Sequence, residues 1–337
     1  MVKKITWILI LSVCAAGTLI SQPKFDIENA PAPLYRDPIY DGAADPSVIW
    51  NEGTGEWWIF YTQRRASTPS QGVSWAYGTA IGIAASADNG KTWYYKGVSL
   101  GLDFEGGQLT FWAPEVLQAN GEYHMFVTFI RGIYHAWGGE RHIIHLTSPD
   151  LINWTFRSQL ELSSDQVIDP GVIQMEDGTW RIWYKDEADG SHSKAADSKN
   201  LYEWKMVDES SVTDRSHEAP NVIFWKYFYW LLGDTGLGIP VYRSSDGDNW
   251  EPQELIMVDP GQRDDDGWYG QHPDVVILND RAFIFYFVHA GRRLFDNPDF
   301  AYNDTFPFEY KRTSLQVAEL EVINGKLRCD RDKYFRE

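Results

Sequence analysis

The chain has very little cysteine. Cys14 and Cys329 are the only two in 337 residues. A zinc site or cluster built on several cysteine ligands is therefore excluded, and so is a framework of disulfides. The protein has to be stabilised by its packed core.

Runs of basic residues are also missing. The formal net charge is −18, and after Lys3-Lys4 no run of Lys and Arg is longer than two residues. Because affinity for a phosphate backbone needs clustered Lys and Arg, nucleic-acid binding is excluded as a function. The acidity also disfavours a strongly anionic substrate, and we interpret it mainly as surface solvation. Arg64-Arg65 and Arg292-Arg293 are interpreted as solvated surface in the same way.

Long apolar runs are absent except at the N-terminus. The basic start Met1–Lys4 is followed by apolar residues from Ile5 to Ile20 and then by Ser21-Gln22-Pro23. This order is typical of a secretory signal peptide, whereas a membrane span needs about 20 apolar residues. We expect residues 1–22 to be a signal peptide, residues 23–337 to be one domain, and the mature protein to be secreted or periplasmic.

Cys14 raises one alternative, a lipoprotein. Val13 directly precedes it, whereas a small residue normally precedes a lipidated cysteine, so this alternative is less favoured. Removal of the segment would leave Cys329 alone, and no disulfide within the mature chain would then be possible.

A strand motif recurs along the whole chain. It consists of one residue, a proline, any residue and two aliphatic residues, and its prolines are 68, 56, 50 and 53 residues apart. The copies begin at Asp45, Ala113, Asp169, Ala219 and His272. Proline is tolerated at the first residue of a strand but not in a central ladder position. Each copy therefore predicts the start of a strand, and an aromatic-rich strand follows after a turn.

The repeat predicts the fold class. The first four units close with a Ser-containing polar turn and a tryptophan, as in 86–93, whereas the fifth runs through 314–320 instead. Units of about 50 residues made of strands and turns predict an all-β, five-bladed β-propeller with four antiparallel strands per blade. A β-sandwich is the alternative, but it does not explain the regular spacing. We expect residues 25–40 to help close the ring.

Polar or aromatic residues lie at the start of each of the five repeated strands. In a propeller the innermost strands line a central channel, so their first residues converge on one mouth. The residues at these positions are Asp45, Trp112, Asp169, His217-Glu218 and Gln271-His272. Ala113 and Ala219 show that the motif itself needs no carboxylate. The alternative is that Asp45 and Asp169 only cap turns.

Three acids at one mouth suit the hydrolysis of a glycosidic bond. One carboxyl group protonates the departing oxygen, and a second activates water or attacks the sugar directly. A third acid nearby keeps the pKa of the proton donor high, because like charges resist joint ionisation. The pattern therefore predicts an enzyme that takes an oligosaccharide or polysaccharide as substrate.

The order of the motifs resembles glycoside hydrolase family 43 and its five-bladed relatives. The matching motifs are Asp45-Pro46, Trp112-Ala113-Pro114-Glu115, Asp169-Pro170 and Glu218-Ala219-Pro220. The resemblance implies a single catalytic domain that inverts the anomeric centre, with Asp45 as general base, Asp169 as pKa modulator and Glu218 as general acid. It implies no required cofactor, although His272 matches a histidine that approaches a structural calcium ion or a water in the channel.

One departure from that pattern leaves the proton donor open. The family commonly has Glu-Gly-Pro where this chain has Glu218-Ala219-Pro220, and the adjacent His217-Glu218 is similar to family 117, which acts on red-algal galactans. That likeness makes His217 an alternative acid. We favour Glu218, because neighbouring strand residues point to opposite faces.

Four further residues are expected to bind substrate. Trp112 is predicted to wall the pocket, Glu115 to support it from within the channel, and Gln271 to lie at the entrance of the fifth blade. Arg131 begins the loop 131–141, which is long for a hairpin and is expected to rim the site with Trp137. For Trp112 and His272, an ordinary place in the core is the competing interpretation.

Three other functions compete with this one. The turn 86–93 is similar to the Asp-box of sialidases, which is a structural motif. The three arginines and the tyrosine nucleophile that sialidases need cannot be identified in this sequence. Arg36-Asp37-Pro38 is like an invertase motif, but it lies outside the repeat. A non-catalytic carbohydrate-binding propeller has no need of three carboxylates. We expect exo action on oligosaccharides from plant or algal polysaccharides, and the sequence identifies neither the sugar nor the oligomeric state.

Overall fold

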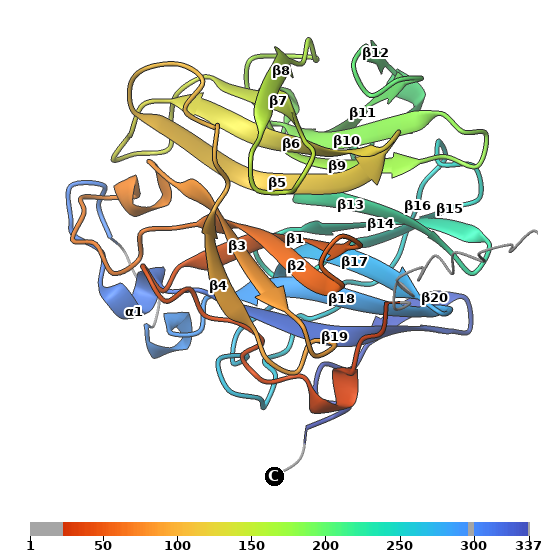
Figure 1. Ribbon diagram of the computed structural model, residues 1–337. Coiled ribbons are helices and arrows are strands. Elements are labelled where there is room, and N and C mark those ends of the chain that lie inside the picture. Colours follow the sequence, from red (N-terminus) through yellow and green to blue (C-terminus); the bar gives the residue numbers. More distant parts are fainter. Residues whose placement is uncertain (1–22, 296–299, 336–337) are drawn as a thin grey trace, which may run out of the picture.

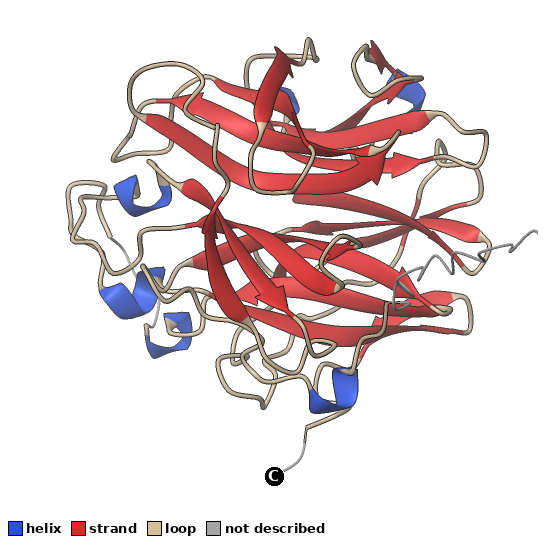
Figure 2. Ribbon diagram, viewed as in Figure 1, coloured by secondary structure: helices blue, strands red, loops and turns tan. Residues whose placement is uncertain are grey.

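The fold was examined in a computed structural model that describes residues 23–295 and 300–335. The predicted signal peptide, residues 1–22, lies outside the described residues. The described chain forms five four-stranded antiparallel sheets joined by turns and loops (Figure 1, Figure 2). The first strands of the five sheets contact one another in a closed ring. The predicted five-bladed β-propeller with four antiparallel strands per blade is confirmed.

Each blade consists of four strands that are consecutive in sequence. Blade one contains β1 (Ala43–Asn51), β2 (Glu56–Gln63), β3 (Ala80–Ser86) and β4 (Tyr94–Val98). Blade two contains β5 (Leu109–Ala119), β6 (Glu122–Arg131), β7 (Arg141–Ser148) and β8 (Thr155–Gln159). Blade three contains β9 (Val167–Gln174), β10 (Trp180–Asp186), β11 (His192–Ser198) and β12 (Lys205–Met206). Blade four contains β13 (Glu218–Trp225), β14 (Phe228–Asp234), β15 (Val241–Ser244) and β16 (Glu251–Pro252). Blade five contains β17 (Gln271–Leu278), β18 (Arg281–Val288), β19 (Ser314–Ile323) and β20 (Lys326–Cys329).

Helices contribute little to the described chain. There is one α-helical turn, α1 (Phe308–Lys311), and the remaining helical segments are single 3-10 turns. These turns are η1 (Ile27–Asn29), η2 (Ser74–Ala76), η3 (Glu187–Asp189), η4 (Asp208–Ser210) and η5 (Arg292–Leu294). None of the helices in the described part is long and apolar enough to cross a membrane.

The first strand of every blade is interrupted at its proline. The antiparallel register of β1, β5, β9, β13 and β17 with the second strand of the same blade shifts there. The residue before each proline lies in the left-handed region, with φ between 46° and 57°. Such a backbone costs a non-glycine residue about 1–3 kcal/mol. The proline repeat is therefore a repeated β-bulge, which changes the direction in which the side chains beside it point.

The polar turns at the ends of blades one to four form as the sequence predicts. In the first blade the Ser86 hydroxyl accepts a hydrogen bond from the Gly90 amide at 2.8 Å, and it donates to Asp88 at 2.9 Å. Ser148, Ser198 and Ser244 accept backbone amide hydrogen bonds in the corresponding turns.

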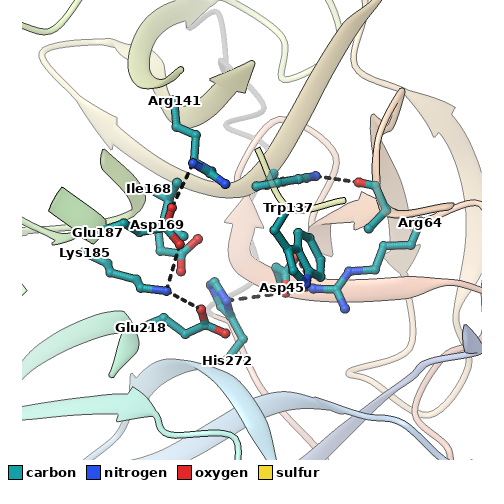
Figure 3. Close-up of a pocket in the computed structure, with 12 residues that line it drawn as sticks. Asp45, Arg64, Trp137, Arg141, Ile168, Asp169, Lys185, Glu187, Glu218 and His272 are labelled. Atoms are coloured by element: carbon teal, nitrogen blue, oxygen red, sulfur yellow. Dashed lines mark hydrogen bonds and ion pairs between the residues drawn. The ribbon is translucent and has the colours of Figure 1, made fainter. Parts of the chain in front are cut away.

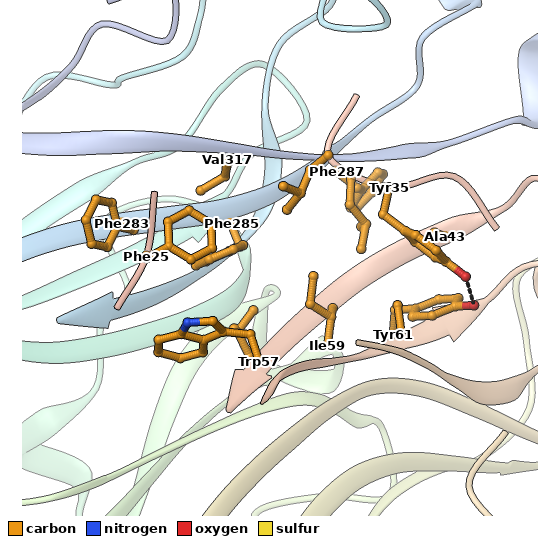
Figure 4. Packing of buried hydrophobic residues seen from close by; sticks show 14 of the residues in the cluster. Phe25, Tyr35, Ala43, Trp57, Ile59, Tyr61, Phe283, Phe285, Phe287 and Val317 are labelled. Atoms are coloured by element: carbon orange, nitrogen blue, oxygen red, sulfur yellow. Dashed lines mark hydrogen bonds between the residues drawn. The ribbon is translucent and has the colours of Figure 1, made fainter. Parts of the chain in front are cut away.

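The N-terminal segment closes the ring, as expected. Tyr35 pairs with Leu315 of β19. Phe25 is buried between blades one and five, with ring centroids 6.1 Å from Trp57 and 5.3 Å from Phe283 (Figure 4). The inner strands β1 and β17 also contact each other directly. Residues 25–35 therefore join the first blade to the last.

Replacing Phe25 by alanine tests this closure. The variant leaves a cavity between two blades, so we expect the free energy of unfolding to fall by about 3–5 kcal/mol. Urea denaturation followed by tryptophan fluorescence measures the change.

The control for this prediction lies in the same segment. The side chain of Ile39 is half exposed, and we expect Ile39→Ala to change the free energy of unfolding by less than about 0.5 kcal/mol. Equal effects of the two substitutions would contradict a closing role for Phe25.

Candidate active site

The five inner strands surround a pocket at one mouth of the channel. Its volume is about 430 Å³, within the range of small-ligand sites. Each inner strand contributes to its lining, and the contributing residues are Asp45, Trp112, Asp169, Glu218 and His272. Figure 3 shows most of them converging from different blades. The predicted convergence of the strand starts therefore holds in space.

The bulge decides which residue of each strand enters the pocket. In blades one, three and five the residue before proline has a polar side chain, and that residue lines the pocket. In blades two and four this position is Ala113 or Ala219, and the preceding residue, Trp112 or Glu218, lines the pocket instead. Glu218 thus reaches the same mouth as Asp45 although it lies one position earlier in the repeat.

The channel narrows directly beneath this pocket. All five prolines of the repeat line a cavity of only about 10 Å³, which is barely space for one water molecule. Glu115 lies at this level, where the Val172 amide donates to its carboxylate at 3.3 Å. Burial, together with the charge of Asp274, raises the pKa of Glu115 well above its usual value. The predicted supporting residue Glu115 therefore lies below the pocket and does not line it.

Asp45 is held by two basic side chains. Arg64 Nη2 donates to both of its carboxylate oxygens, at 2.9 and 3.1 Å, and His272 Nδ1 lies 3.4 Å from Oδ1. Burial lowers the pKa of His272 despite the nearby charge of Asp45, so the imidazole is neutral at neutral pH. Arg64 is thus part of the pocket, which corrects our interpretation of Arg64-Arg65 as solvated surface.

Asp169 is the most enclosed of the three acids. It is 6% exposed, and its carboxylate accepts a hydrogen bond from the Ala219 amide at 3.2 Å. Burial and the charge of Glu218 raise the pKa of Asp169 well above its usual value, although Lys185 opposes them. Asp169 therefore holds a proton more readily than an ordinary aspartate.

Glu218 is the end of a chain of ion pairs. Lys185 Nζ donates to Glu218 Oε2 at 2.9 Å and to Glu187 Oε1 at 3.2 Å, and Arg141 Nη1 lies 3.1 Å from Glu187 Oε2 (Figure 3). Burial raises the pKa of Glu218, but Lys185 outweighs it, and the pKa falls below its usual value. This is the opposite of the raised pKa that the sequence predicted for the proton donor. The side chain of Glu218 is still 41% exposed, so a ligand can reach it from the pocket.

His217 points away from this pocket. It directly precedes β13 and is 2% exposed. Its Nε2 lies 2.7 Å from the Ser193 hydroxyl, and its Nδ1 lies 2.9 Å from the Arg215 carbonyl oxygen. Burial lowers the pKa of this imidazole. His217 directly precedes Glu218 in sequence, but it does not line the pocket.

Aromatic side chains form one wall of the pocket. Trp112 lines it, as predicted, and its indole N–H donates to the Ala76 carbonyl oxygen at 2.6 Å. Trp137, from the loop expected to rim the site, also lines it. The rings of Trp112 and Trp137 have centroids 6.0 Å apart.

Two predicted substrate-binding residues lie elsewhere. Arg131 pairs with Glu105, with Nε 2.6 Å from Oε1, and its side chain is 53% exposed outside the pocket lining. Gln271 is buried and donates to Asp234 at 3.3 Å. Burial and the charge of Glu218 raise the pKa of Asp234 to about 7. Gln271 therefore contacts a residue behind the pocket wall.

The side chains near His272 do not form a calcium site by themselves. In residues 23–295 and 300–335, no group of three or more His, Cys, Asp or Glu side chains is arranged to hold a metal ion. A calcium ion beside His272 stays a prediction from the resemblance.

The sequence reasoning missed three charged residues of the pocket: Arg141, Lys185 and Glu187. Lys185 lies two residues after Trp183 on β10, so strand alternation places both on one face. Trp183 packs with Tyr229 and Tyr242 of blade four. The aromatic-rich strand that the sequence predicts in the third unit covers 179–184, and extending it by one residue would have included Lys185 and directed it toward Glu218.

Sequence comparison gives no relative: no protein-family model and no curated protein matches the chain. The fold is similar to that of solved family 43 glycoside hydrolases. A thermostable family 43 enzyme is 18% identical, with 88% of this chain and 96% of that chain covered and a TM-score of 0.62. The family 43 subfamily 1 enzyme from Xanthomonas citri, complexed with xylotriose, is 15% identical, with 88% and 92% covered and a TM-score of 0.63.

A third similar structure comes from a compost microbial metagenome. It is a family 43 β-xylosidase/α-arabinofuranosidase in complex with xylotriose, in a calcium-free form, and it is 15% identical. The match covers 91% of this chain and 98% of that chain, with a TM-score of 0.64. The chain therefore has the five-bladed propeller fold of family 43 glycoside hydrolases.

Replacing Lys185 by methionine tests the electrostatics of the pocket. Lys185 lowers the pKa of Glu218, whereas burial and the charge of Asp45 raise it. We therefore expect Lys185→Met to raise the pKa of Glu218 above its value in the parent protein. Carbon-13 NMR titration of labelled glutamate side chains measures the change, with Glu218→Gln identifying the signal.

Lys194→Met is the matched control, because Lys194 pairs with Asp189 and does not line the pocket. It should leave the pKa of Glu218 unchanged. An unaltered pKa in Lys185→Met would show that the ion pair does not set the charge of Glu218.

Proposed function

We propose that the chain is an inverting glycoside hydrolase in which Asp45 is the general base, Glu218 the general acid and Asp169 the pKa modulator. The observation that supports this most strongly is the meeting of these three acids, from three blades, in one pocket with a narrow floor. The loop 131–141, which contributes Trp137 to the lining, walls one side of the pocket and favours exo action.

Asp45 suits the role of general base. In an inverting reaction the base takes a proton from water while the water oxygen bonds to the anomeric carbon. Arg64 and His272 fix the orientation of the Asp45 carboxylate.

Glu218 has to be protonated before it can donate to the departing oxygen. Lys185 opposes this in the free pocket, but Glu187 offers a second carboxylate 3.2 Å from the same Nζ. A shift of Lys185 toward Glu187 would raise the pKa of Glu218, and the negative charges of Asp45 and Glu187 would remain in place. As the bond to the anomeric carbon breaks, the proton moves from Glu218 to the leaving oxygen.

The position of His217 favours Glu218 over His217 as the acid. His217 is enclosed by Ser193 and Arg215, and a proton released there has no direct path to the pocket. Hydrolysis of a red-algal galactan through His217 is therefore the weaker alternative.

The fold and the charges of the pocket indicate the class of substrate. Each cation that lines the pocket is paired with a carboxylate: Arg64 with Asp45, Arg141 with Glu187, and Lys185 with Glu218. This pairing favours a neutral sugar. Because similar structures include a β-xylosidase/α-arabinofuranosidase, xylosides and arabinofuranosides from plant polysaccharides are the first candidates.

The proposed location of the protein is secreted or periplasmic, as the signal-like N-terminal sequence predicts.

Two substitutions test the assigned roles. Aryl xylosides, arabinofuranosides and galactosides with leaving groups of different acidity would be assayed with the parent protein, Asp45→Asn and Glu218→Gln. We expect Asp45→Asn to reduce kcat by about 10²–10⁴-fold with every leaving group. Glu218→Gln should be impaired mainly with poor leaving groups, because a good one departs without a proton.

Glu105→Gln is the control, because Glu105 pairs with Arg131 outside the pocket. It should keep parental activity. A parent protein that binds these sugars but turns over none of them would indicate a non-catalytic propeller. A leaving-group dependence in Asp45→Asn instead of Glu218→Gln would reverse the two roles.

A further inference from the structure

Trp137 is an exposed tryptophan at the pocket. Trp137 is 54% exposed, whereas the neighbouring Trp112 is 9% exposed. It lines the same cavity as Asp45 and Glu218. A large apolar ring left open to water beside a polar pocket marks a place where a ligand binds.

The backbone around Trp137 is fixed before any ligand arrives. The Tyr77 hydroxyl accepts a hydrogen bond from the Gly138 amide at 3.0 Å and donates to the Gly138 carbonyl oxygen at 3.0 Å. The Val73 amide donates to the His135 carbonyl oxygen at 2.9 Å. Arg141 Nη1 donates to the Gly139 carbonyl oxygen at 3.1 Å. The loop is therefore anchored on both sides of Trp137.

Close packing reinforces this anchoring. A side chain at Gly72 would place its Cβ 1.9 Å from the His135 carbonyl oxygen, and Gly72 has a φ of +54°. Only glycine fits there, so the loop sits directly on the segment that follows β2. An exposed ring on a fixed backbone binds with a small loss of conformational entropy.

One side of the Trp137 ring is already covered. Its centroid lies 6.0 Å from that of the buried Tyr77 and 6.0 Å from that of Trp112. These aromatic contacts hold the indole, and the exposed remainder is open to the pocket. Asp45 and Asp169 are 4% and 6% exposed, so these two acids lie deeper than the indole.

We propose that Trp137 is a stacking platform for the second sugar unit, the one that carries the leaving oxygen, and that this unit is a neutral pyranose. The proposal rests on the proposed function for the direction of binding. A terminal unit fills the deep part beside Asp45 and Asp169, so the next unit lies at the mouth, against the indole. A pyranose ring with equatorial hydroxyls presents a flat face of C–H bonds, and such a face matches an aromatic ring. The cations of the pocket are each paired with a carboxylate, which favours a neutral second unit over an anionic one.

Binding of xylotriose and xylose by the inactive Asp45→Asn protein tests the platform. NMR titration gives both dissociation constants with and without the additional substitution Trp137→Ala. We expect Trp137→Ala to weaken xylotriose binding about tenfold or more and to leave xylose binding unchanged. Trp137→Phe, which keeps an aromatic ring, should recover part of the loss.

Tyr227→Asn is the matched control: Tyr227 is 88% exposed, lies outside the pocket lining and has a φ of 68°, which asparagine tolerates. It should change neither constant. An equal loss of affinity for both sugars would place Trp137 at the cleaved unit and overturn the proposal. So would an unchanged affinity for xylotriose, or no binding of xylotriose by the Asp45→Asn protein. Failure of the proposed function would be seen separately, as a parent protein without turnover.

Discussion

The β-bulge at each inner strand is the constraint on which the site depends. It places a residue in the left-handed region in all five blades, at φ values between 46° and 57°. In a regular strand, successive side chains alternate between the two faces of the sheet. Without the bulge, the side chain at the start of the strand would not point toward the channel mouth. The bulge instead presents one polar or aromatic side chain per blade to a common pocket. The strain of about 1–3 kcal/mol at each position is offset by the packing of the blades around it.

Charge pairing is the second organising feature of the pocket. Asp45 pairs with Arg64 and lies 3.4 Å from His272, whereas Glu218 shares Lys185 with Glu187. The two carboxylates thus have different partners: one has a fixed guanidinium, and the other has a lysine that a second carboxylate also contacts. Within the described residues no basic side chain bonds to Asp169, and burial raises the pKa of this acid. This asymmetry among three similar groups is what suits them to different roles.

The repeat made most of the fold predictable. Five prolines at near-regular spacing located every inner strand, and the convergence of those strands located Asp45, Trp112, Asp169, Glu218 and His272 at the pocket. Lys185, Glu187 and Arg141 were missed because the repeat places no motif where they lie. Lys185 is near the end of the second strand of blade three, Glu187 is in the turn η3 that follows it, and Arg141 begins the third strand of blade two. Arg131 and Gln271 were placed at the site from their positions in sequence, but their side chains turn to Glu105 and Asp234. Local side-chain partners of this kind depend on neighbouring blades, and sequence spacing does not encode them.

The central claim is that Asp45 activates water for a single displacement while Glu218 protonates the leaving oxygen. The most direct test is proton NMR of the first sugar released, recorded before the anomers equilibrate. A single displacement predicts a product whose anomeric configuration is opposite to that of the substrate. A first product with retained configuration would require a covalent intermediate and would contradict the role assigned to Asp45.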